Sequence, residues 1–259
     1  MKLKNFSLKQ IADSGQVFRF TEISDGVFDV RSLDKRLIIK NGEEIIDPYW
    51  KNYFDLDTDY SRFIKAVPKE DDYLTRAARF SEGVRILNQD PWEMLISFII
   101  SQRKSIPAIR TSIEKLCEKF GTLKKDKNGE WYAFPTPAQL AEASMDDILA
   151  CSVGYRAEYI SLAANAALRR EIDLEACKSL PDEGLKEELL RLRGVGEKVA
   201  NCVMLFGFHR IGAFPVDVWI KRVLDEHYDG EFPMEKYEGF AGIMQQYMFF
   251  YAKSIAHLD

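Results

Sequence analysis

Long apolar runs are missing from this chain of 259 residues. The longest obvious one, from Met94 to Ile100, is far shorter than the roughly 20 residues that a membrane-spanning helix needs. The first six residues also lack the apolar core of a secretory signal peptide. We therefore expect an intracellular protein that has no contact with a membrane.

Cysteine and histidine are scarce and dispersed. The chain has three histidines, far apart in the sequence, and four scattered cysteines, Cys117, Cys151, Cys177 and Cys202. Metal sites need such ligands at short spacings, and disulfides are typical of secreted proteins. The sequence therefore predicts buried reduced thiols and no metal site.

Net positive charge is missing as well. Lys and Arg number 36 against 41 Asp and Glu, a formal net charge of −5, which argues against a strongly basic nucleic-acid binder. The distribution of charge matters more than its sum, and cations outnumber acids between residues 103 and 127. Within that stretch we expect only Arg103 and Lys104, directly after an apolar run, to contact a polyanion.

Two kinds of pattern divide the chain, which has no repeats or low-complexity tracts. Up to about residue 85, apolar segments between turn signals predict a largely β region, with strands at 16–23, 27–32 and 36–39 and a partly helical bridge from residue 47. From Asp90 onward helical periodicity predicts helices at 91–101, 106–120, 137–143, 145–150, 155–169, 183–192, 197–208, 218–226 and 236–255. We therefore predict an α+β fold, with a mainly β, antiparallel-sheet subdomain at 1–88 and a helical domain at 89–259.

The most informative segment runs from Leu192 to Ala200 and reads Leu-Arg-Gly-Val-Gly-Glu-Lys-Val-Ala. Apolar periodicity on both sides predicts two helices joined by the Gly194-Val195-Gly196 turn, a helix-hairpin-helix at about 183–208. The glycines let a partner approach the backbone closely, and unpaired N–H groups at the start of the second helix form an anion site. Such units commonly hold DNA through its phosphates without reading its sequence.

Two side chains near this hairpin indicate chemistry. Lys198 falls in the first turn of the second helix, and Asp217 is a lone carboxylate in an apolar run, where an unpaired charge is costly. Each alone has a plainer interpretation, as a solvated lysine and as a helix cap. A P-loop is excluded because Leu192, Glu197 and Val199 occupy positions where that motif needs two glycines and a hydroxyl.

The hairpin followed by Pro-Val-Asp resembles the helix-hairpin-helix, Gly/Pro-Asp superfamily of DNA base-excision glycosylases. Three further segments are similar to motifs of its 8-oxoguanine DNA glycosylase family: Ser14–Phe20, Asp90–Ser101 and Gly154–Tyr159. The matches run in order from residue 14 to about residue 252. The resemblance implies a sheet followed by two helical subdomains with a DNA-binding cleft between them. The dispersed cysteines exclude the iron–sulfur loop of the endonuclease III relatives.

The resemblance implies a bifunctional enzyme, an 8-oxoguanine DNA glycosylase that also has AP lyase activity. Because duplex DNA shields the glycosidic bond, the damaged base has to be flipped into a pocket. Lys198, as the uncharged amine, would attack the sugar C1′ and form a Schiff base, while Asp217 stabilises positive charge on the sugar. β-Elimination of the 3′ phosphate follows from the Schiff base, and no cofactor is required.

Matching positions also imply how the base and the DNA are held. Gln245 resembles the glutamine that binds the Watson–Crick edge, and Phe249 and Cys202 resemble the two walls that sandwich the base. Gly15 resembles the glycine whose carbonyl accepts the N7–H that 8-oxoguanine has and guanine lacks, and Pro215 of the Pro-Val-Asp segment is placed with them. The positions matched to DNA contacts are Arg103, Lys104, Tyr155, Arg156, Gly194, Val195 and Gly196. Plainer interpretations stay open for some of these residues. The methionine and aromatic side chains at 240–250 could simply pack in the core of a helix, and Tyr155 could be a capping aromatic on a loop.

The chain departs from the family's eukaryotic pattern at three places. Arg103-Lys104-Ser105 replaces an asparagine triplet, Trp219 replaces a histidine, and Ala108 replaces an arginine that contacts the cytosine opposite the lesion. The loss of that arginine predicts a relaxed preference for the opposite base.

Two other functions stay open, a sister glycosylase for another damaged base and a non-catalytic DNA-binding module. We expect double-stranded DNA containing oxidised guanine as the partner and no obligate protein partner, which predicts a monomer. We expect the protein to be located where the genomic DNA is. In a bacterium or archaeon this is the cytoplasm, at the nucleoid, and in a eukaryote it is the nucleus.

Overall fold

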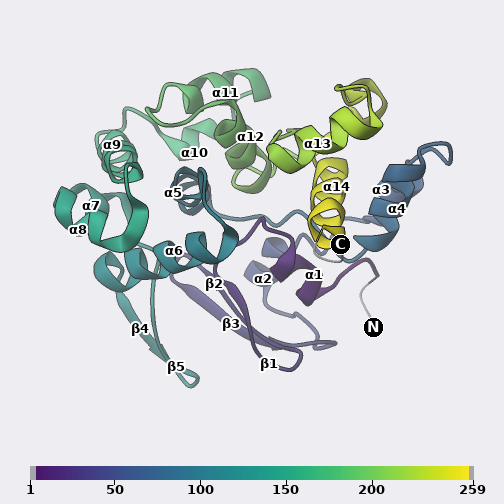
Figure 1. Ribbon diagram of the computed structural model, residues 1–259. Helices are drawn as coiled ribbons and strands as arrows, with labels where there is room; N and C mark the ends of the chain where they lie inside the picture. Colours follow the sequence, from purple (N-terminus) through teal and green to yellow (C-terminus); the bar gives the residue numbers. More distant parts are fainter. Residues whose placement is uncertain (1–3, 257–259) are drawn as a thin grey trace.

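A three-stranded antiparallel sheet lies below the helices in the computed structural model, which describes residues 4–256 (Figure 1). Residues 1–3 and 257–259, the ends of the two predicted domains, lie outside the described range. The strands, paired in sequence order, are β1 (Phe20–Ser24), β2 (Val27–Ser32) and β3 (Lys35–Lys40). Phe28 and Val30, two residues apart, bury the same face of the sheet. The first strand was predicted to begin at residue 16 but begins at Phe20. The side chain of Gln16 instead forms hydrogen bonds with the backbone of Arg85 and Leu87.

The N-terminal segment is more helical than the sequence suggested. It contains α1 (Leu8–Asp13), α2 (Pro48–Tyr53), α3 (Ser61–Lys65) and α4 (Asp72–Phe80). α1 and α2 pack with the sheet in a small core that ends at Phe54 and Leu87. Leu74, Ala77 and Ala78 of α4 belong instead to the large helical core. The division at residue 88 therefore stays a prediction, and residues 60–86 share the core of the second half.

Helix α5 (Pro91–Ser101) is the centre of the second half. Asp90 accepts hydrogen bonds from the backbone N–H of Trp92 and Glu93, and Pro91 occupies the first helical position, so the start of the helix is strongly specified. Residues 91–100 are all buried. A helix that is buried on every face has to be surrounded by others.

The surrounding elements follow the predicted helical order. They are α6 (Ile106–Phe120), α7 (Pro137–Ala141), α8 (Met145–Ile148), α9 (Arg156–Leu168), α10 (Leu174–Cys177), α11 (Asp182–Leu190), α12 (Glu197–Phe206), α13 (Val218–His227) and α14 (Ala241–Ile255). A π-helical turn at Leu149–Val153 extends α8, and a 3-10 turn at Met234–Tyr237 precedes α14. The predicted helix at 236–255 is therefore interrupted, at Gly239, whose φ is +79°. The hairpin of β4 (Leu123–Asp126) and β5 (Gly129–Tyr132) was not predicted.

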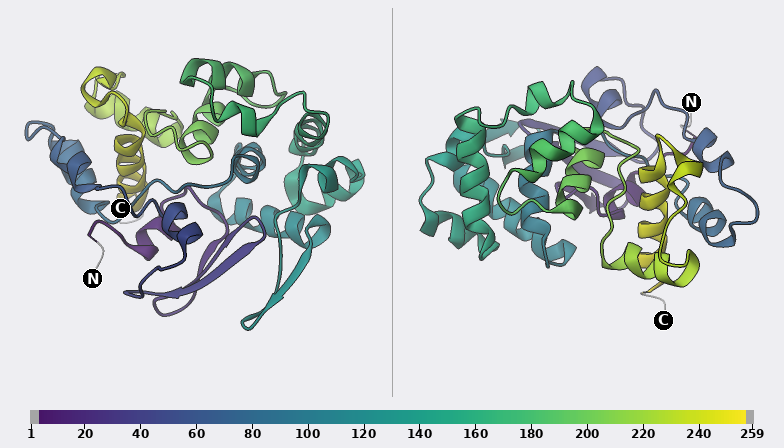
Figure 2. Two further views of the ribbon diagram at one scale, coloured as in Figure 1. Left: turned by 180° about the vertical axis from the view of Figure 1, so that it is seen from behind. Right: turned by 90° about the horizontal axis from the view of Figure 1, so that it is seen from above.

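The helices form two groups, as the view from above shows (Figure 2). In one group α5 packs against α6, α9 and α12, and in the other α14 lies beside α4 and α13. This arrangement agrees with the α+β fold expected from the sequence. Among residues 4–256, no helix is long and apolar enough to cross a membrane.

Candidate functional site

The hairpin between α11 and α12 has the predicted helix-hairpin-helix form. Glycine is required at position 194 for two reasons. Its φ of +87° is unfavourable for other residues, and a side chain there would collide with the ring of Tyr159. Val195 is buried. Gly196 caps α12 without a side-chain acceptor, and the N–H groups of residues 197–199 have no acceptor between residues 4 and 256. A Cβ at Gly196 would meet nothing within 4 Å, so packing does not demand glycine there.

Lys198, Cys202 and Phe206 recur every four residues and therefore share one face of α12. All three line a cavity of about 50 Å³. The Lys198 Nζ lies 5.3 Å from the centroid of the Phe98 ring, which itself stacks on Phe206. The lysine expected to be the nucleophile thus borders a cavity whose wall beside it is aromatic.

Asp217 lines the same cavity from the segment before α13. Its Oδ1 accepts hydrogen bonds from the N–H groups of Trp219 (3.0 Å) and Ile220 (2.9 Å), which makes it the N-cap of α13. The cap fixes the carboxylate and places it at the positive end of the helix dipole. Pro215, buried, lines the cavity two residues earlier. The helix-cap interpretation and the site interpretation of Asp217 therefore both hold.

The opposite side of the cavity comes from α14 and from the loop after α1. Gln245 and Phe249, one turn apart, line it together with Gly15. A Cβ on Gly15 would lie 2.8 Å from Phe249 Cε1, and the φ of Gly15 is +81°. The Oε1 of Gln245 is buried and has no hydrogen-bond partner among residues 4–256. A buried acceptor without a donor is costly in a protein and indicates a missing ligand donor.

The two predicted walls differ in character. Burial raises the pKa of the Cys202 thiol, an effect that the nearby Lys198 opposes. Cys202 is therefore a neutral, polarisable surface, and Phe249 is an aromatic one. A flat, apolar group fits between such walls.

Besides the three residues of the hairpin, the residues predicted to contact DNA lie in the loop before α6 and at the start of α9. Arg103 is exposed, with φ +50°, and Tyr155 is 53% exposed. The guanidinium of buried Arg156 donates to the carbonyls of Val153 and Gln102 and lies 4.3 Å from the centroid of the Tyr155 ring. The structure thus exposes Arg103 and Tyr155 and commits Arg156 to internal carbonyls.

Lys104 also bonds within the protein. Its Nζ donates to the carbonyl of Ser152 (2.6 Å) and to the Ser112 hydroxyl. Arg156 therefore donates to the segment before α6, and Lys104 donates to the segment before α9, so that each segment holds the other. Gln102 Nε2 adds a hydrogen bond to the carbonyl of Gly194 at 3.0 Å, which joins these segments to the hairpin.

Sequence reasoning missed three residues of the cavity, Phe98, Phe206 and Gln246. Phe206 carried a signal, because it continues the spacing of Lys198 and Cys202. Phe98 and Gln246 belong to helices that are buried on nearly every side, so periodicity could not single them out.

No cluster of three or more potential metal ligands occurs in the described part of the chain. The four cysteines are free thiols and buried. The ten residues that line the cavity are Gly15, Phe98, Lys198, Cys202, Phe206, Pro215, Asp217, Gln245, Gln246 and Phe249.

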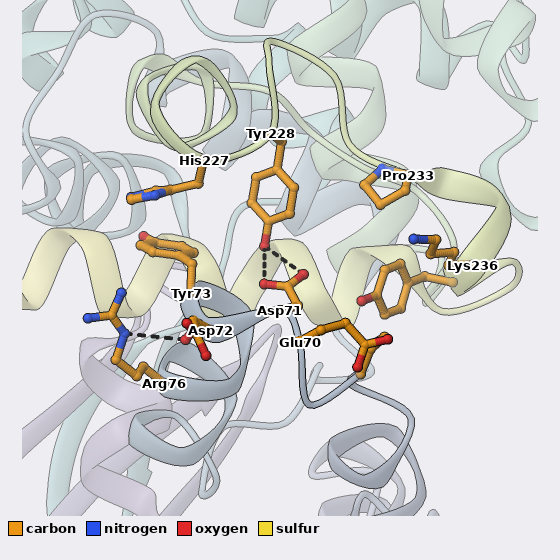
Figure 3. A pocket seen from close by; sticks show the side chains of 11 residues that line it. Glu70, Asp71, Asp72, Tyr73, Arg76, His227, Tyr228, Pro233 and Lys236 are labelled. Carbon is orange, nitrogen blue, oxygen red and sulfur yellow. Dashed lines mark hydrogen bonds between the residues drawn. The ribbon is translucent and has the colours of Figure 1, made fainter.

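A larger depression of about 410 Å³ lies between α4 and the far end of α13 (Figure 3). Tyr228 Oη donates to both carboxylate oxygens of Asp71, and the Tyr73 ring stacks on His227 with centroids 4.1 Å apart. None of its eleven lining residues borders the Lys198 cavity. Because α13 begins at the Asp217 cap, these contacts anchor the other end of the helix that positions that carboxylate.

Comparisons with known proteins agree with this geometry. Two sequence-family models match, "8-oxoguanine DNA glycosylase, N-terminal domain" over residues 1–95 and "HhH-GPD superfamily base excision DNA repair protein" over residues 96–233. The probable N-glycosylase/DNA lyase of Methanothermobacter thermautotrophicus is 33% identical over 235 residues, which cover 80% of this chain and 74% of that protein. The N-glycosylase/DNA lyase of Saccharomyces cerevisiae is 36% identical over 159 residues, which cover 57% of this chain and 42% of that protein.

A solved structure is similar over almost the whole chain. The Clostridium acetobutylicum 8-oxoguanine glycosylase/lyase, in complex with double-stranded DNA containing cytosine opposite 8-oxoguanine, superposes with a TM-score of 0.91 at 37% identity. The match covers 98% of this chain and 93% of that one. The chain belongs to the 8-oxoguanine DNA glycosylase family of the HhH-GPD superfamily.

Proposed function

We propose that this chain is a bifunctional DNA repair enzyme that removes 8-oxoguanine from duplex DNA and then cleaves the strand as an AP lyase. The observation that carries the proposal is the convergence of Lys198 and Asp217 on one cavity whose other side offers Gln245, Phe249 and Gly15. These five residues come from four separate segments of the chain. A DNA-binding module without catalysis would not need an amine and a carboxylate beside a base-binding surface.

The chemistry follows from the two polar groups. The lone pair of the uncharged Lys198 Nζ forms a bond to C1′ as the C1′–N9 bond breaks and its electrons leave with the base. The Asp217 carboxylate stabilises the positive charge that develops on the sugar in the transition state. Loss of a proton from the attacking nitrogen and opening of the sugar ring give the Schiff base. Removal of a C2′ proton then expels the 3′ phosphate, and water releases the lysine.

The walls account for the choice of base. The unpaired Gln245 Oε1 accepts from the N–H groups of the guanine Watson–Crick edge. Cys202 and Phe249 enclose the ring, and the Gly15 carbonyl accepts the N7–H of 8-oxoguanine. The Phe249 ring lies close to Gly15, where an added Cβ would be 2.8 Å from Cε1, so we expect the incoming base to displace this ring.

Contacts to the DNA backbone come from the hairpin, the loop before α6 and the start of α9. The free N–H groups at the start of α12 bind phosphate, and the bare Cα of Gly196 lets it come close. Arg103 fills the gap left by the flipped base, and Tyr155 wedges into the stack. Arg156 and Lys104 donate hydrogen bonds to carbonyls within the protein. They contact the DNA only where a phosphate or a cytosine takes over as the acceptor of these hydrogen bonds.

We further propose a relaxed preference for the base opposite the lesion. Ala108 has no donor for a cytosine, and the Arg156 guanidinium is engaged by Val153 and Gln102. We expect excision rates of 8-oxoguanine opposite cytosine and opposite adenine to agree within about tenfold, since a lost hydrogen-bonded contact is worth about 1 kcal/mol. Single-turnover assays on the two duplexes measure this, and strong selectivity for cytosine would refute it.

Borohydride trapping tests the main proposal. Wild-type protein with an 8-oxoguanine duplex should give a covalent adduct after reduction of the Schiff base. Lys198→Gln should lose both the adduct and excision while it still binds the lesion, because the hairpin amides remain. Failure of the wild type to be trapped would favour a non-catalytic module, and trapping only on another damaged base would favour a sister glycosylase.

The chain also fits action as a monomer, since one protomer supplies every residue of the cavity. We propose that it works alone on genomic DNA, at the nucleoid or in the nucleus according to the cell. Light scattering should give a mass near 29.9 kDa, and a stable dimer would refute the monomer.

A further inference from the structure

The loop that carries Gly15 is held by side chains from outside it. The backbone carbonyls on both sides of Gly15 accept hydrogen bonds, Ala12 from Arg110 (2.6 Å), Asp13 from Lys253 (3.1 Å), Ser14 from Gln246 (2.7 Å) and Gln16 from Gln89 (3.0 Å). The Gly15 carbonyl receives no donor from any residue between 4 and 256. The single carbonyl of this run that accepts no hydrogen bond from these residues therefore belongs to Gly15, the residue of the run that lines the cavity.

The donors come from the elements that build the rest of the site. Arg110 belongs to α6, and Gln246 and Lys253 belong to α14, the helix that also presents Gln245 and Phe249. Gln246 is 2% exposed and itself lines the cavity. Because a buried amide that loses its partner is destabilising, this bond fixes the spacing between α14 and the loop.

The two cations fit their acceptors. Ala12 and Asp13 are the last residues of α1, whose C-terminal carbonyls carry the negative end of the helix dipole. Arg110 and Lys253 therefore bind where helix geometry already favours positive charge. Both side chains are partly buried, so neither is a freely moving surface group.

We propose that Arg110, Gln246 and Lys253 are positioning residues for lesion discrimination, which hold three consecutive carbonyls so that the Gly15 carbonyl meets an N7–H donor on the flipped purine. The inference rests on the proposed function. A hydrogen bond weakens steeply as its length and angle depart from the optimum. Discrimination by one N–H therefore requires an acceptor that cannot drift toward or away from the base.

The test compares affinities for matched duplexes that contain either 8-oxoguanine or guanine, in a Lys198→Gln background that prevents cleavage. We expect Gln246→Met and Lys253→Met each to lower the ratio of the two affinities by roughly five- to tenfold, the effect of one hydrogen bond. Lys253→Arg keeps a donor and should restore most of the ratio. Lys119→Met is the matched control, because it removes a cation from the exposed face of α6 that, within the described part of the chain, pairs only with Asp147.

A second measurement separates positioning from general damage. With Lys198 restored, the Lys253→Met protein, whose changed residue does not line the cavity, should cleave a preformed abasic site at the wild-type rate, since that reaction has no base to read. The inference would be overturned if neither Gln246→Met nor Lys253→Met changed the affinity ratio in the Lys198→Gln background, or if Lys253→Met lost lyase activity in parallel with excision. A Lys198→Gln protein that shows no preference for 8-oxoguanine would overturn the proposed function and the inference with it.

Discussion

The two carboxylate oxygens of Asp217 have different surroundings. Oδ1 accepts both capping hydrogen bonds of α13, whereas Oδ2 accepts none from residues 4–256. The side chain also borders the Lys198 cavity. The cap and the charge can therefore be removed separately.

Asp217→Asn should keep the cap and lose the charge. Asparagine caps helices as well as aspartate does, so we expect the free energy of unfolding to change by less than about 0.5 kcal/mol. Excision should slow by roughly 100-fold or more, because a fixed charge that stabilises the transition state is lost. Asp217→Ala should show the same slowing and lose a further ~1 kcal/mol of stability. Single-turnover excision and urea unfolding measure the two effects, and a fully active Asp217→Asn protein would exclude the proposed role of the charge.

The sequence predicted which residues surround the site better than it predicted what they touch. Lys198, Asp217 and Gln245 were identified from motifs, and the structure brings them to one cavity. Lys104 and Arg156 were expected to face DNA because Lys104 follows a position matched to the family, and Arg156 itself lies in a matching motif. Their internal acceptors, at Ser152, Val153 and Gln102, depend on a loop geometry that residue type does not encode.

At the scale of elements, local signals determined which boundaries were predictable. α5 and α6 have the bounds expected from the sequence, since proline is the first residue of α5 and the second of α6, and buried residues recur along most of each helix. The β4–β5 hairpin was missed because its first strand, Leu-Lys-Lys-Asp, is almost entirely exposed and shows no apolar alternation. α4 was not assigned to the helical core because its partner, α14, lies more than 150 residues further along the chain.

The two glycines of the hairpin should respond differently to alanine. Gly194→Ala places a Cβ against the Tyr159 ring at a positive φ, so we expect a loss of more than about 1 kcal/mol in stability. Gly196→Ala meets no protein atom within 4 Å and should lower stability by no more than about 1 kcal/mol, the difference expected between glycine and alanine at an N-cap. Its Cβ would stand where phosphate approaches the backbone, so duplex affinity should fall several-fold. Thermal unfolding and filter binding measure the pair, and undiminished DNA binding by Gly196→Ala would argue against phosphate contact at this turn.

At the scale of the whole molecule, the sheet and the helical core meet at buried charges. Glu93, in the first turn of α5, accepts a hydrogen bond of 2.7 Å from the N–H of Leu33, the residue directly after β2. Arg19, which leads into β1, donates to the Tyr132 carbonyl and to Glu114 of α6. These bonds join the sheet, α5, α6 and the β4–β5 hairpin, so the orientation of the sheet depends on polar contacts as well as on apolar packing.

The Glu93 carboxyl makes this junction sensitive to pH. Burial raises its pKa from 4.5 to about 7, although Arg19 opposes the shift. Between pH 4.5 and 7 the folded protein keeps the proton and the unfolded chain releases it, so stability falls as the pH rises through this interval. Above pH 7 the loss should level off at about 3 kcal/mol. Glu93→Gln cannot ionise and still accepts the hydrogen bond from the Leu33 N–H. Its free energy of unfolding, relative to that of the wild type, should therefore increase as the pH is raised from 5 to 8.

Urea unfolding across that range measures the difference, and Glu118→Gln on the exposed side of α6 is the control. The control removes a carboxylate without a buried partner, so its unfolding curve should follow the wild type at every pH. If Glu93→Gln also followed the wild type, the buried carboxyl would not be the group that releases its proton on unfolding. The junction would then depend on its other polar links between sheet and helices, the hydrogen bonds that Arg19 and Arg31 donate to Glu114 of α6.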